Sequence, residues 1–468
     1  MRRALSLVSA GLFVLLATAT SLAKEASPTE WPLDRIITNL EAKVREAPNY
    51  GFAHYNLGRA HAFAFALKSS ALWGYREDAL LDVKERERLP SSGAPLDENT
   101  LLAHLAEGIR HLCLANELGP EHEEYHLTFA WLCEIGASSA ERIDTASAFH
   151  LGVDGLPADE LARLERLVTE LGSREEGAAN SARSTLLQPE NLEHAVPLLC
   201  RELSSNDERP RRVATDLVRQ YWIERAIASY WRAFDIAISS DLSKDRVIFK
   251  VGTDLHDLVS SEALDGYRRL VEQRGATVAE RKNLVMAAEK FQQLSAKPRG
   301  AFITPVLVTF QGCASLDELV TPDLAVPFDL DGDYVDELWP WLAPGTGWLV
   351  WDPKHRGEIT SGRQLFGSAS GWLFFEDGYR VLDALDDDRD GELRGPELSG
   401  IAVWFDRDSD GVSDRGEVVP VEALGIVALA TRATERIGAS LGNPGGLELA
   451  DGRTLPTYDW VLERRSEP

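Results

Sequence analysis

The chain has 468 residues, of which 26% are charged, and its formal net charge at pH 7 is −26. This length allows two or three domains with separate cores, and an apolar content of 44% excludes a wholly disordered chain. The negative charge argues against nucleic acids and anionic membranes as partners, because an acidic surface repels both.

The first 23 residues have the pattern of a secretory signal peptide. Arg2 and Arg3 form a basic end, residues 5–19 are mainly apolar, and residues 21–23 (Ser-Leu-Ala) offer a small-residue cleavage site. We therefore expect cleavage after Ala23 and a mature protein that is secreted or periplasmic. An uncleaved signal anchor is the alternative, although the apolar run is short for a membrane span. After cleavage we expect no stable membrane span.

Residues 24–298 are predicted to form an all-α domain, because apolar residues recur three and four apart and β-branched runs are rare. Residues 53–61 and 108–120 have the spacing of the first and second helices of a tetratricopeptide repeat, and residues 226–236 repeat the second-helix spacing. The region therefore resembles a divergent array of such repeats, although a strict period of about 34 residues is absent. The resemblance implies a platform for an unidentified protein partner.

A five-residue segment in the helical region matches the zinc-hydrolase pattern H-E-x-x-H. His122 and His126 could supply two imidazole ligands, and Glu123 could act as a general base. Against this, Pro120 marks the end of a predicted repeat, which makes His126 a packing position of the next helix. A zinc-dependent hydrolase built on this motif is the alternative to the function favoured below.

The four cysteines leave the disulfide state open. Their even number permits disulfides in an oxidising compartment, whereas their apolar surroundings fit buried thiols equally well. None has the spacing of a metal site. The cysteines are Cys113, Cys133, Cys200 and Cys313.

Residues 299–468 are predicted to form a small α+β module. Residues 301–310 are β-branched and aromatic, and seven of the 12 tryptophans follow residue 330, in short strand-like segments such as 347–351 and 401–405. Between residues 323 and 422 there are 23 acidic and 8 basic residues. Such an excess needs either solvent or bound cations for its neutralisation.

Two twelve-residue segments of this module, 386–397 and 406–417, fit the EF-hand calcium-loop pattern. Each has aspartates at positions 1, 3 and 5, glycine at position 6 and glutamate at position 12. Calcium requires six to eight oxygen ligands, and position 7 contributes a backbone carbonyl. An aspartate-rich turn without an ion is the alternative. The predicted ligands are Asp386, Asp388, Asp390, Glu392, Glu397, Asp406, Asp408, Asp410, Val412 and Glu417.

The two loops lie too close together for a sensor of the calmodulin type. Only residues 398–405 separate them, and eight helical residues span about 12 Å, too little for an exit helix, a turn and an entry helix. A single strand or one short helix must join the loops. We therefore expect calcium to have a structural rather than a sensory role.

Two further segments depart from the loop pattern. Asp329, Asp331 and Asp333 could form a weak third calcium site, although Tyr334 replaces the turn glycine and Pro340 stands at position 12. Residues 352–363 have the length of a calcium loop but carry basic residues at positions 3 and 5. We expect this segment to keep its turn and to bury Ile359.

The order and spacing of these segments resemble a module of secreted bacterial EF-hand proteins, also found near the C-terminus of some haemolysin-type calcium-binding proteins. The resemblance covers residues 328–428 and implies calcium binding outside the cytoplasm. No Ser/His/Asp signature, phosphate-binding glycine loop or Cys-x-x-Cys motif is present in the sequence, so we expect a protein that is not an enzyme.

Overall fold

The computed structural model describes most of the chain outside its N-terminus. The described residues are 30–73, 94–153, 155–245, 247–249, 258–297, 299–310, 315–332, 335–373 and 375–463. The predicted signal peptide, Cys313 and Asp333 lie outside these residues. Within them, no helix has both the length and the apolar character that crossing a membrane requires.

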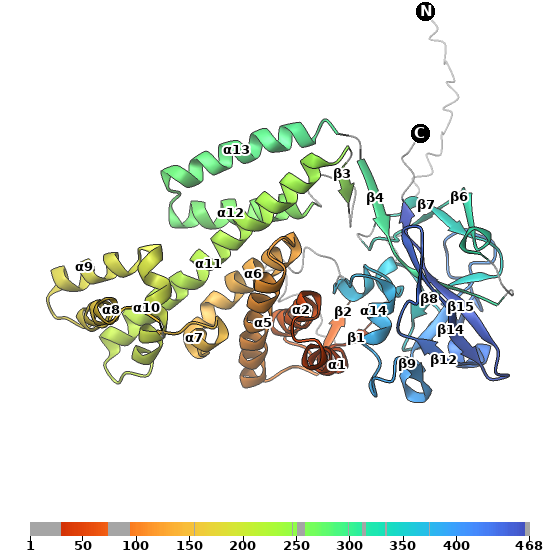
Figure 1. Ribbon diagram of the computed structural model, residues 1–468, viewed down its shortest axis with the longest axis horizontal. Helices are drawn as coiled ribbons and strands as arrows, with labels where there is room; N and C mark the ends of the chain where they lie inside the picture. Colours follow the sequence, from red (N-terminus) through yellow and green to blue (C-terminus); the bar gives the residue numbers. More distant parts are fainter. Residues whose placement is uncertain are drawn as a thin grey trace, which may run out of the picture.

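Helices dominate the N-terminal region, as predicted, and consecutive helices pack side by side (Figure 1). The longest helix, α11, has 36 residues and runs along this region, in contact with both α6 and α12. The helices are α1 (Leu33–Glu46), α2 (Gly51–Leu67), α5 (Glu98–Leu118), α6 (Glu123–Gly136), α7 (Thr145–Ala148), α8 (Ala158–Glu170), α9 (Glu176–Leu186), α10 (Pro189–Glu202), α11 (Glu208–Ser243), α12 (Val259–Arg274) and α13 (Val278–Leu294).

Helices α2 and α5 approach each other closely at two glycines. A Cβ atom at Gly58 would lie 2.7 Å from Leu112 Cγ, and one at Gly108 would lie 3.4 Å from the carbonyl oxygen of Gly58. A larger residue at either position would therefore push the helices apart. The close approach brings the side chains on either side of the glycines into direct contact across the interface.

Two histidine pairs occupy this interface. The Nδ1 atoms of His54 and His111 are 2.9 Å apart, and those of His61 and His104 are 2.8 Å apart. His54 Nε2 lies 3.0 Å from the carbonyl oxygen of Pro48, which can only accept a hydrogen bond, so His54 carries its proton on Nε2. Burial lowers the pKa of both His54 and His111, which favours neutral rings, and in that state the proton shared by the first pair lies on His111 Nδ1.

The C-terminal region is an antiparallel β half-barrel. Its nine-stranded sheet has the order β11-β10-β8-β5-β15-β14-β12-β9, with β13 attached to β14. The strands of this sheet are β5 (Val306–Thr309), β8 (Thr346–Trp351), β9 (Glu392–Arg394), β10 (Ile401–Trp404), β11 (Val418–Pro420), β12 (Ile426–Ala430), β13 (Glu435–Ile437), β14 (Ser440–Leu449) and β15 (Thr454–Asp459).

Smaller sheets join the two regions or flank the half-barrel. β1 (Glu30–Pro32) pairs with β2 (Ala71–Trp73), and a hairpin is formed by β6 (Val320–Phe328) and β7 (Glu337–Leu342). β4 (Arg299–Ile303) lies between β16 (Leu462–Glu463) and β3, which comprises residues 247–249 of the helical region. The helical region therefore contributes a strand to a sheet that also contains β16, which is formed by residues 462–463.

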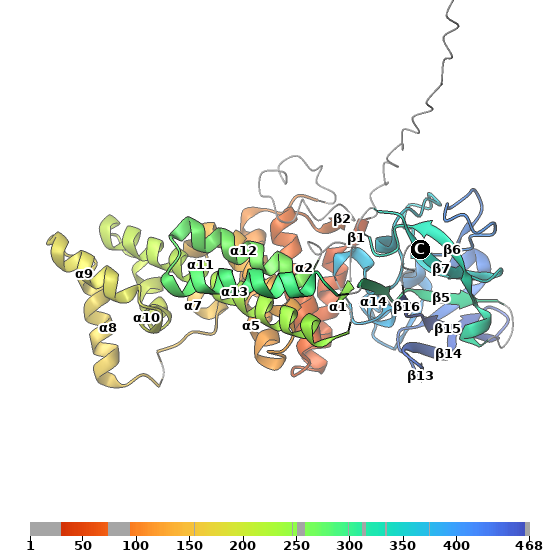
Figure 2. The same cartoon turned by 90° about the horizontal axis from the view of Figure 1, so that it is seen from above.

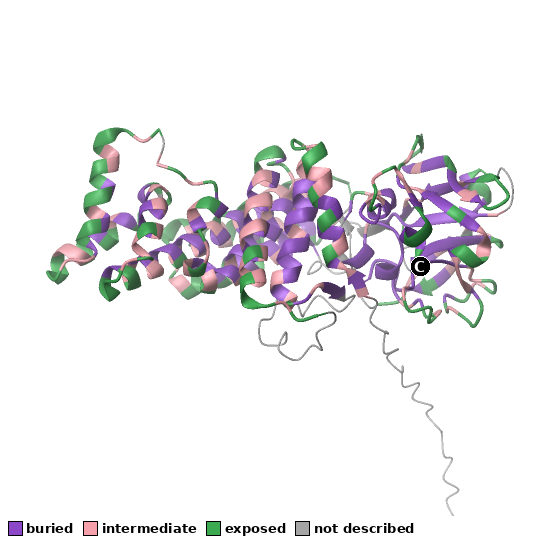
Figure 3. Ribbon diagram, turned by 90° about the horizontal axis from the view of Figure 1, so that it is seen from below, coloured by how far each residue is buried: buried purple, intermediate pink, exposed green. Residues whose placement is uncertain are grey.

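Tryptophans form the core beneath the hairpin. Trp341 packs edge-on against Trp348 and Trp404, with ring centroids 5.5 and 5.8 Å apart, and all three side chains are fully buried. Trp348 and Trp404 are register partners on β8 and β10. The segment between the two predicted calcium loops is therefore a core strand, as its apolar sequence indicated. Figure 3 shows many buried segments in the β-rich end of the molecule.

α13 ends at Leu294 and β4 begins at Arg299. The region predicted to be all-α also contains the short strands β1, β2 and β3. The helical content of the predicted α+β module is smaller than expected. In the described part of the module it is limited to α14 (Gly378–Asp383) and short 3-10 turns. Figure 2 shows the β-rich half at one end of an elongated array, with α1 at the junction and α8 and α9 at the far end.

Candidate metal centre

The two predicted calcium loops have the same closed backbone. In the first, Asp386 Oδ2 accepts the Gly391 N–H at 3.0 Å, and in the second, Asp406 Oδ2 accepts the Gly411 N–H at 2.9 Å. Both glycines have a positive φ, +94° and +76°, which a residue with a Cβ atom rarely adopts. Positions 1 and 6 therefore close each loop around its own interior.

The glutamate at position 12 fixes the other end of each loop. Glu397 Oε1 accepts the Asp387 N–H at 2.6 Å, and its Oε2 accepts the Arg394 N–H at 3.0 Å. Glu417 accepts the equivalent N–H groups, at loop positions 2 and 9, at 2.7 and 3.0 Å. Both glutamates are largely buried, so each loop holds an oriented carboxylate on its inner side.

Carboxylate oxygens converge in both loops. One set comprises Asp386, Asp388 and Asp390, and the other comprises Asp406, Asp408 and Glu417; within each set the ligand atoms lie within 4.8 Å of one another. The other predicted ligands lie on the same two loops, outside these sets. They are Glu392, Glu397, Asp410 and Val412. Position 7 is held in place by position 5, because the N–H groups of residues 392 and 412 bond to aspartate oxygens at 2.8 and 2.7 Å.

The first aspartate of each loop lies where the charged form of its carboxyl group is disfavoured. Burial raises the pKa of Asp386 and of Asp406 above the ordinary range, because a charged carboxylate loses its hydration there. A cation in the loop would favour the ionised form of both groups. The donor set, which consists of oxygen atoms, suits a hard cation such as calcium.

Two buried indoles orient the second loop, which the sequence alone did not indicate. Trp341 Nε1 donates to Asp406 Oδ2 at 2.7 Å, and Trp404 Nε1 lies 3.4 Å from Glu417 Oε2. These bonds hold the carboxylates at loop positions 1 and 12. The only sequence signal was the high frequency of tryptophan around the loops.

Residues 352–363 keep the backbone closure of a calcium loop but carry basic residues at positions 3, 5 and 12. Asp352 Oδ2 accepts the Gly357 N–H at 2.9 Å, which is the same closure as in the two acidic loops. Ile359 is fully buried, as predicted, and its N–H donates to Ser413 Oγ at 2.8 Å. Both residues stand at loop position 8, so this segment pairs with the second acidic loop.

A buried arginine stands beside the possible third site. Asp329 and Asp331 are 2% and 1% exposed, and Arg363, which is 2% exposed, donates from Nε to the carbonyl oxygen of Gly332 at 2.6 Å. The guanidinium brings a permanent positive charge to this turn. That charge disfavours a calcium ion at the same place.

The turn beside Arg363 is too tight for any side chain at Gly362. A Cβ atom there would lie 1.7 Å from the carbonyl oxygen of Leu330. Gly362→Ala should therefore lower the free energy of unfolding by about 1–3 kcal/mol, because the backbone has to move. The matched control is Gly177→Ala in α9, where nothing lies within 4 Å and the change should leave stability unchanged or raise it by up to about 1 kcal/mol. Urea unfolding at a fixed calcium concentration measures both, and equal effects would contradict this packing.

The zinc-binding alternative does not have the geometry that its motif requires. His122 is the residue before α6, with extended backbone angles, so it does not share a helical face with His126. His126 Nε2 lies 3.0 Å from the carbonyl oxygen of Pro120. Among the described residues, neither histidine belongs to a cluster that could hold a metal ion.

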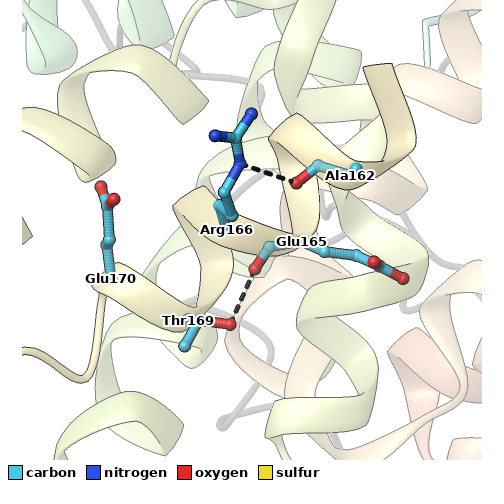
Figure 4. Close-up of a pocket in the computed structure, with 5 residues that line it drawn as sticks. All are labelled: Ala162, Glu165, Arg166, Thr169 and Glu170. Carbon is cyan, nitrogen blue, oxygen red and sulfur yellow. Dashed lines mark hydrogen bonds between the residues drawn. The ribbon is translucent and has the colours of Figure 1, made fainter. Parts of the chain in front are cut away.

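A hollow on α8 is not a convincing site either. Figure 4 shows that its five lining residues come from that one helix. Arg166 Nε donates to the carbonyl oxygen of Ala162 at 3.2 Å, and Thr169 Oγ1 to that of Glu165 at 2.8 Å. These side chains bond to their own helix and do not converge on a common point.

Residues 317–463 match the family model of the SPM domain. The match contains both acidic loops, the degenerate loop and the tryptophan core. The chain is also similar to the iron-regulated protein FrpA of Neisseria meningitidis serogroup C, with 31% identity over 134 residues. That alignment covers 26% of this chain and 12% of FrpA, so the chain spans only about an eighth of this relative.

The three described cysteines are free thiols. Cys113 and Cys133 are buried and Cys200 is partly buried, and burial raises the pKa of all three. The described part of the chain therefore contains no reactive thiolate among its cysteines.

Proposed function

We propose that the C-terminal region binds two calcium ions, one in each of the EF-hand-type loops 386–397 and 406–417. The observation that carries this proposal is the convergence of three carboxylates in each loop, within 4.8 Å, on a backbone closed by a glycine of positive φ. Carboxylate and carbonyl oxygens are the ligands that calcium prefers. Further oxygens are available from position 7, at Glu392 and Val412, and from Glu397 and Asp410.

The segment that joins the two loops supports a structural role for calcium. β10 lies between them, is paired with β8 and β11, and carries Trp404 in the core. A strand fixed on both sides leaves no pair of helices to open on binding. The ions would instead neutralise carboxylates that otherwise repel one another, and so stabilise the half-barrel.

We also propose that the helical region, with its tetratricopeptide-like spacing, is a platform for a protein partner. The predicted signal peptide supports a mature protein that is secreted or periplasmic, where calcium can be plentiful. The Arg363 guanidinium supports two calcium ions rather than three. The motif of the zinc-dependent hydrolase does not have the required geometry, and the measurement below tests that function directly.

Metal analysis of the purified full-length protein distinguishes these functions. We expect two calcium ions per chain and no zinc, and one ion fewer after either Asp388→Ala or Asp408→Ala. The control is Asp451→Ala, which removes an exposed acid paired with Arg453 on another turn and should leave both ions bound. One tightly held zinc that is lost in His126→Ala would overturn the proposal in favour of the hydrolase.

A further inference from the structure

Helix α1 lies directly on the first acidic loop, although more than 300 residues separate them in sequence. Arg35 Nε forms an ion pair with Asp387 Oδ1 at 2.7 Å. Asn39 Nδ2 donates to the same oxygen at 3.0 Å and to the carbonyl oxygen of Ala384 at 3.1 Å. One carboxylate of the loop is therefore held by two side chains on successive turns of α1.

A second loop residue reaches across to the far end of α1. The guanidinium of Arg389 bonds to both carboxylate oxygens of Glu46, at 2.7 and 2.5 Å, and donates to the carbonyl oxygen of Asn39 at 3.0 Å. Arg389 is only 19% exposed and has a φ of +66°, so the loop backbone dictates where this side chain points. Bidentate pairing of this kind requires a fixed orientation of the guanidinium.

These contacts use loop positions that alternate with the proposed ligands. Asp387 and Arg389 stand at positions 2 and 4, whereas the carboxylates that converge stand at positions 1, 3 and 5. An ion that fixes the odd positions therefore also fixes the residues between them. The backbone that forms the calcium site is the same backbone that presents the docking residues to α1.

The second acidic loop has a different neighbour. It lies against the β6–β7 hairpin, through the Trp341–Asp406 bond and a close approach of Gly411 to the carbonyl oxygen of Pro327. An added Cβ at Gly411 would lie 2.5 Å from that oxygen. The two loops therefore have different neighbours: the first contacts α1 of the helical region, and the second contacts the β6–β7 hairpin.

We propose that calcium in loop 386–397 clamps the helical region onto the half-barrel through α1, whereas calcium in loop 406–417 stabilises the half-barrel alone. This inference rests on the proposed calcium binding and assigns different roles to the two ions. Thermodynamic linkage makes the coupling reciprocal, so docking of α1 raises the calcium affinity of the first loop by the same factor.

A second contact holds the start of α1 without involving the loop. Trp31 stacks on Trp351 with ring centroids 5.2 Å apart, and Trp351 Nε1 donates to the carbonyl oxygen of Glu30 at 2.8 Å. Trp31 is 1% exposed, so this anchor is apolar and does not depend on the ion. Removal of calcium should therefore loosen α1 while the chain stays joined at Trp31.

Hydrogen exchange of the full-length protein, with calcium or with a chelator, tests the clamp. Calcium should slow exchange of the α1 amides by about fivefold or more, the lower end of typical coupling. Asp390 and Asp410 form a matched pair, since both are exposed and stand at position 5 of their loops. Asp390→Ala should abolish the effect on α1, and Asp410→Ala should preserve it.

The reciprocal test measures calcium affinity by titration calorimetry in the Asp410→Ala background, where the first loop is the remaining site. Glu46→Gln removes the carboxylate that pairs with Arg389 and should weaken binding by about fivefold or more. Glu41→Gln is the control, because Glu41 is an exposed α1 residue that pairs within its own helix with Arg45. It should leave the affinity unchanged.

The possible outcomes separate the clamp from the calcium site itself. Two bound ions with unchanged exchange of α1 would overturn the clamp and leave the proposed function intact. Equal effects of Asp390→Ala and Asp410→Ala on α1 would also overturn it, because the ions would then act only through global stability. Absence of calcium binding in the unmodified protein would overturn the proposed function, and the clamp with it.

Discussion

Replacing Asp386 and Asp406 together by alanine should abolish the stabilisation of this protein by calcium. Each is the first residue of its loop, is placed by a bond to the glycine at position 6, and has a raised pKa because of burial. At a free calcium concentration about 100 times the dissociation constant, one site adds roughly 2.7 kcal/mol to the free energy of unfolding. Two independent sites should therefore add roughly 5 kcal/mol, which the double variant should not gain.

Urea unfolding with calcium and with a chelator measures this difference. The calcium-free stabilities must also be compared, because alanine removes the hydrogen bonds that close each loop. Asp451→Ala should retain the full calcium effect. If the unmodified protein unfolds at the same urea concentration with and without calcium, the ions do not support the fold and the proposed structural role is wrong.

The acidic loops could be predicted because their geometry is local. A twelve-residue pattern fixes the turn glycine, the positions of the aspartates and the returning glutamate, and the structure has all three in both loops. Local sequence patterns also predicted that Ile359 is buried and that a strand or short helix lies between the loops, and the structure has a buried Ile359 and a strand. In each case the signal that permits the prediction lies within a few residues along the chain.

The surroundings of the loops could not be predicted in this way. The bonds of Trp341 to Asp406 and of Arg35 to Asp387 join residues 65 and 352 positions apart. Such contacts depend on the strand order of the sheet and on how the helical region packs, neither of which hydrophobic periodicity specifies. The motif at His122 shows the converse, because a matching pattern falls at a helix start where its geometry cannot form.

The pairing of histidines between α2 and α5 is a further tertiary contact that could not be predicted from the sequence. Each helix carries two histidines seven residues apart, which alone indicates ordinary core or surface positions. The antiparallel contact at Gly58 and Gly108 makes them partners. Because buried imidazoles resist protonation, this arrangement determines how the protein responds to acid.

Below about pH 6.5, the usual pKa of histidine, the calcium-free protein should lose several kcal/mol of stability through these pairs. Burial, reinforced by His104 and His111, lowers the pKa of His61 to about 3, and burial beside His54 lowers that of His111 to about 4. The unfolded chain therefore binds protons that the folded chain excludes. This stabilising contribution is complete above the unfolded pKa and is lost as the pH falls towards the folded values.

The measurement is the free energy of unfolding between pH 7 and about 4.5, in the presence of a chelator, for the unmodified protein and for His61→Gln with His104→Gln. The pair of amides keeps a polar contact between α2 and α5 but does not titrate, so the double variant should show a flatter pH dependence of the free energy of unfolding.

Burial raises the pKa of the Asp459 carboxyl, so this group contributes a pH dependence of the opposite sign. Because Asp459 is present in both proteins, its contribution cancels in the comparison. Identical slopes in the double variant and the unmodified protein would show that the pairs are protonated without cost, which is incompatible with neutral, mutually hydrogen-bonded imidazoles in a closed helix interface.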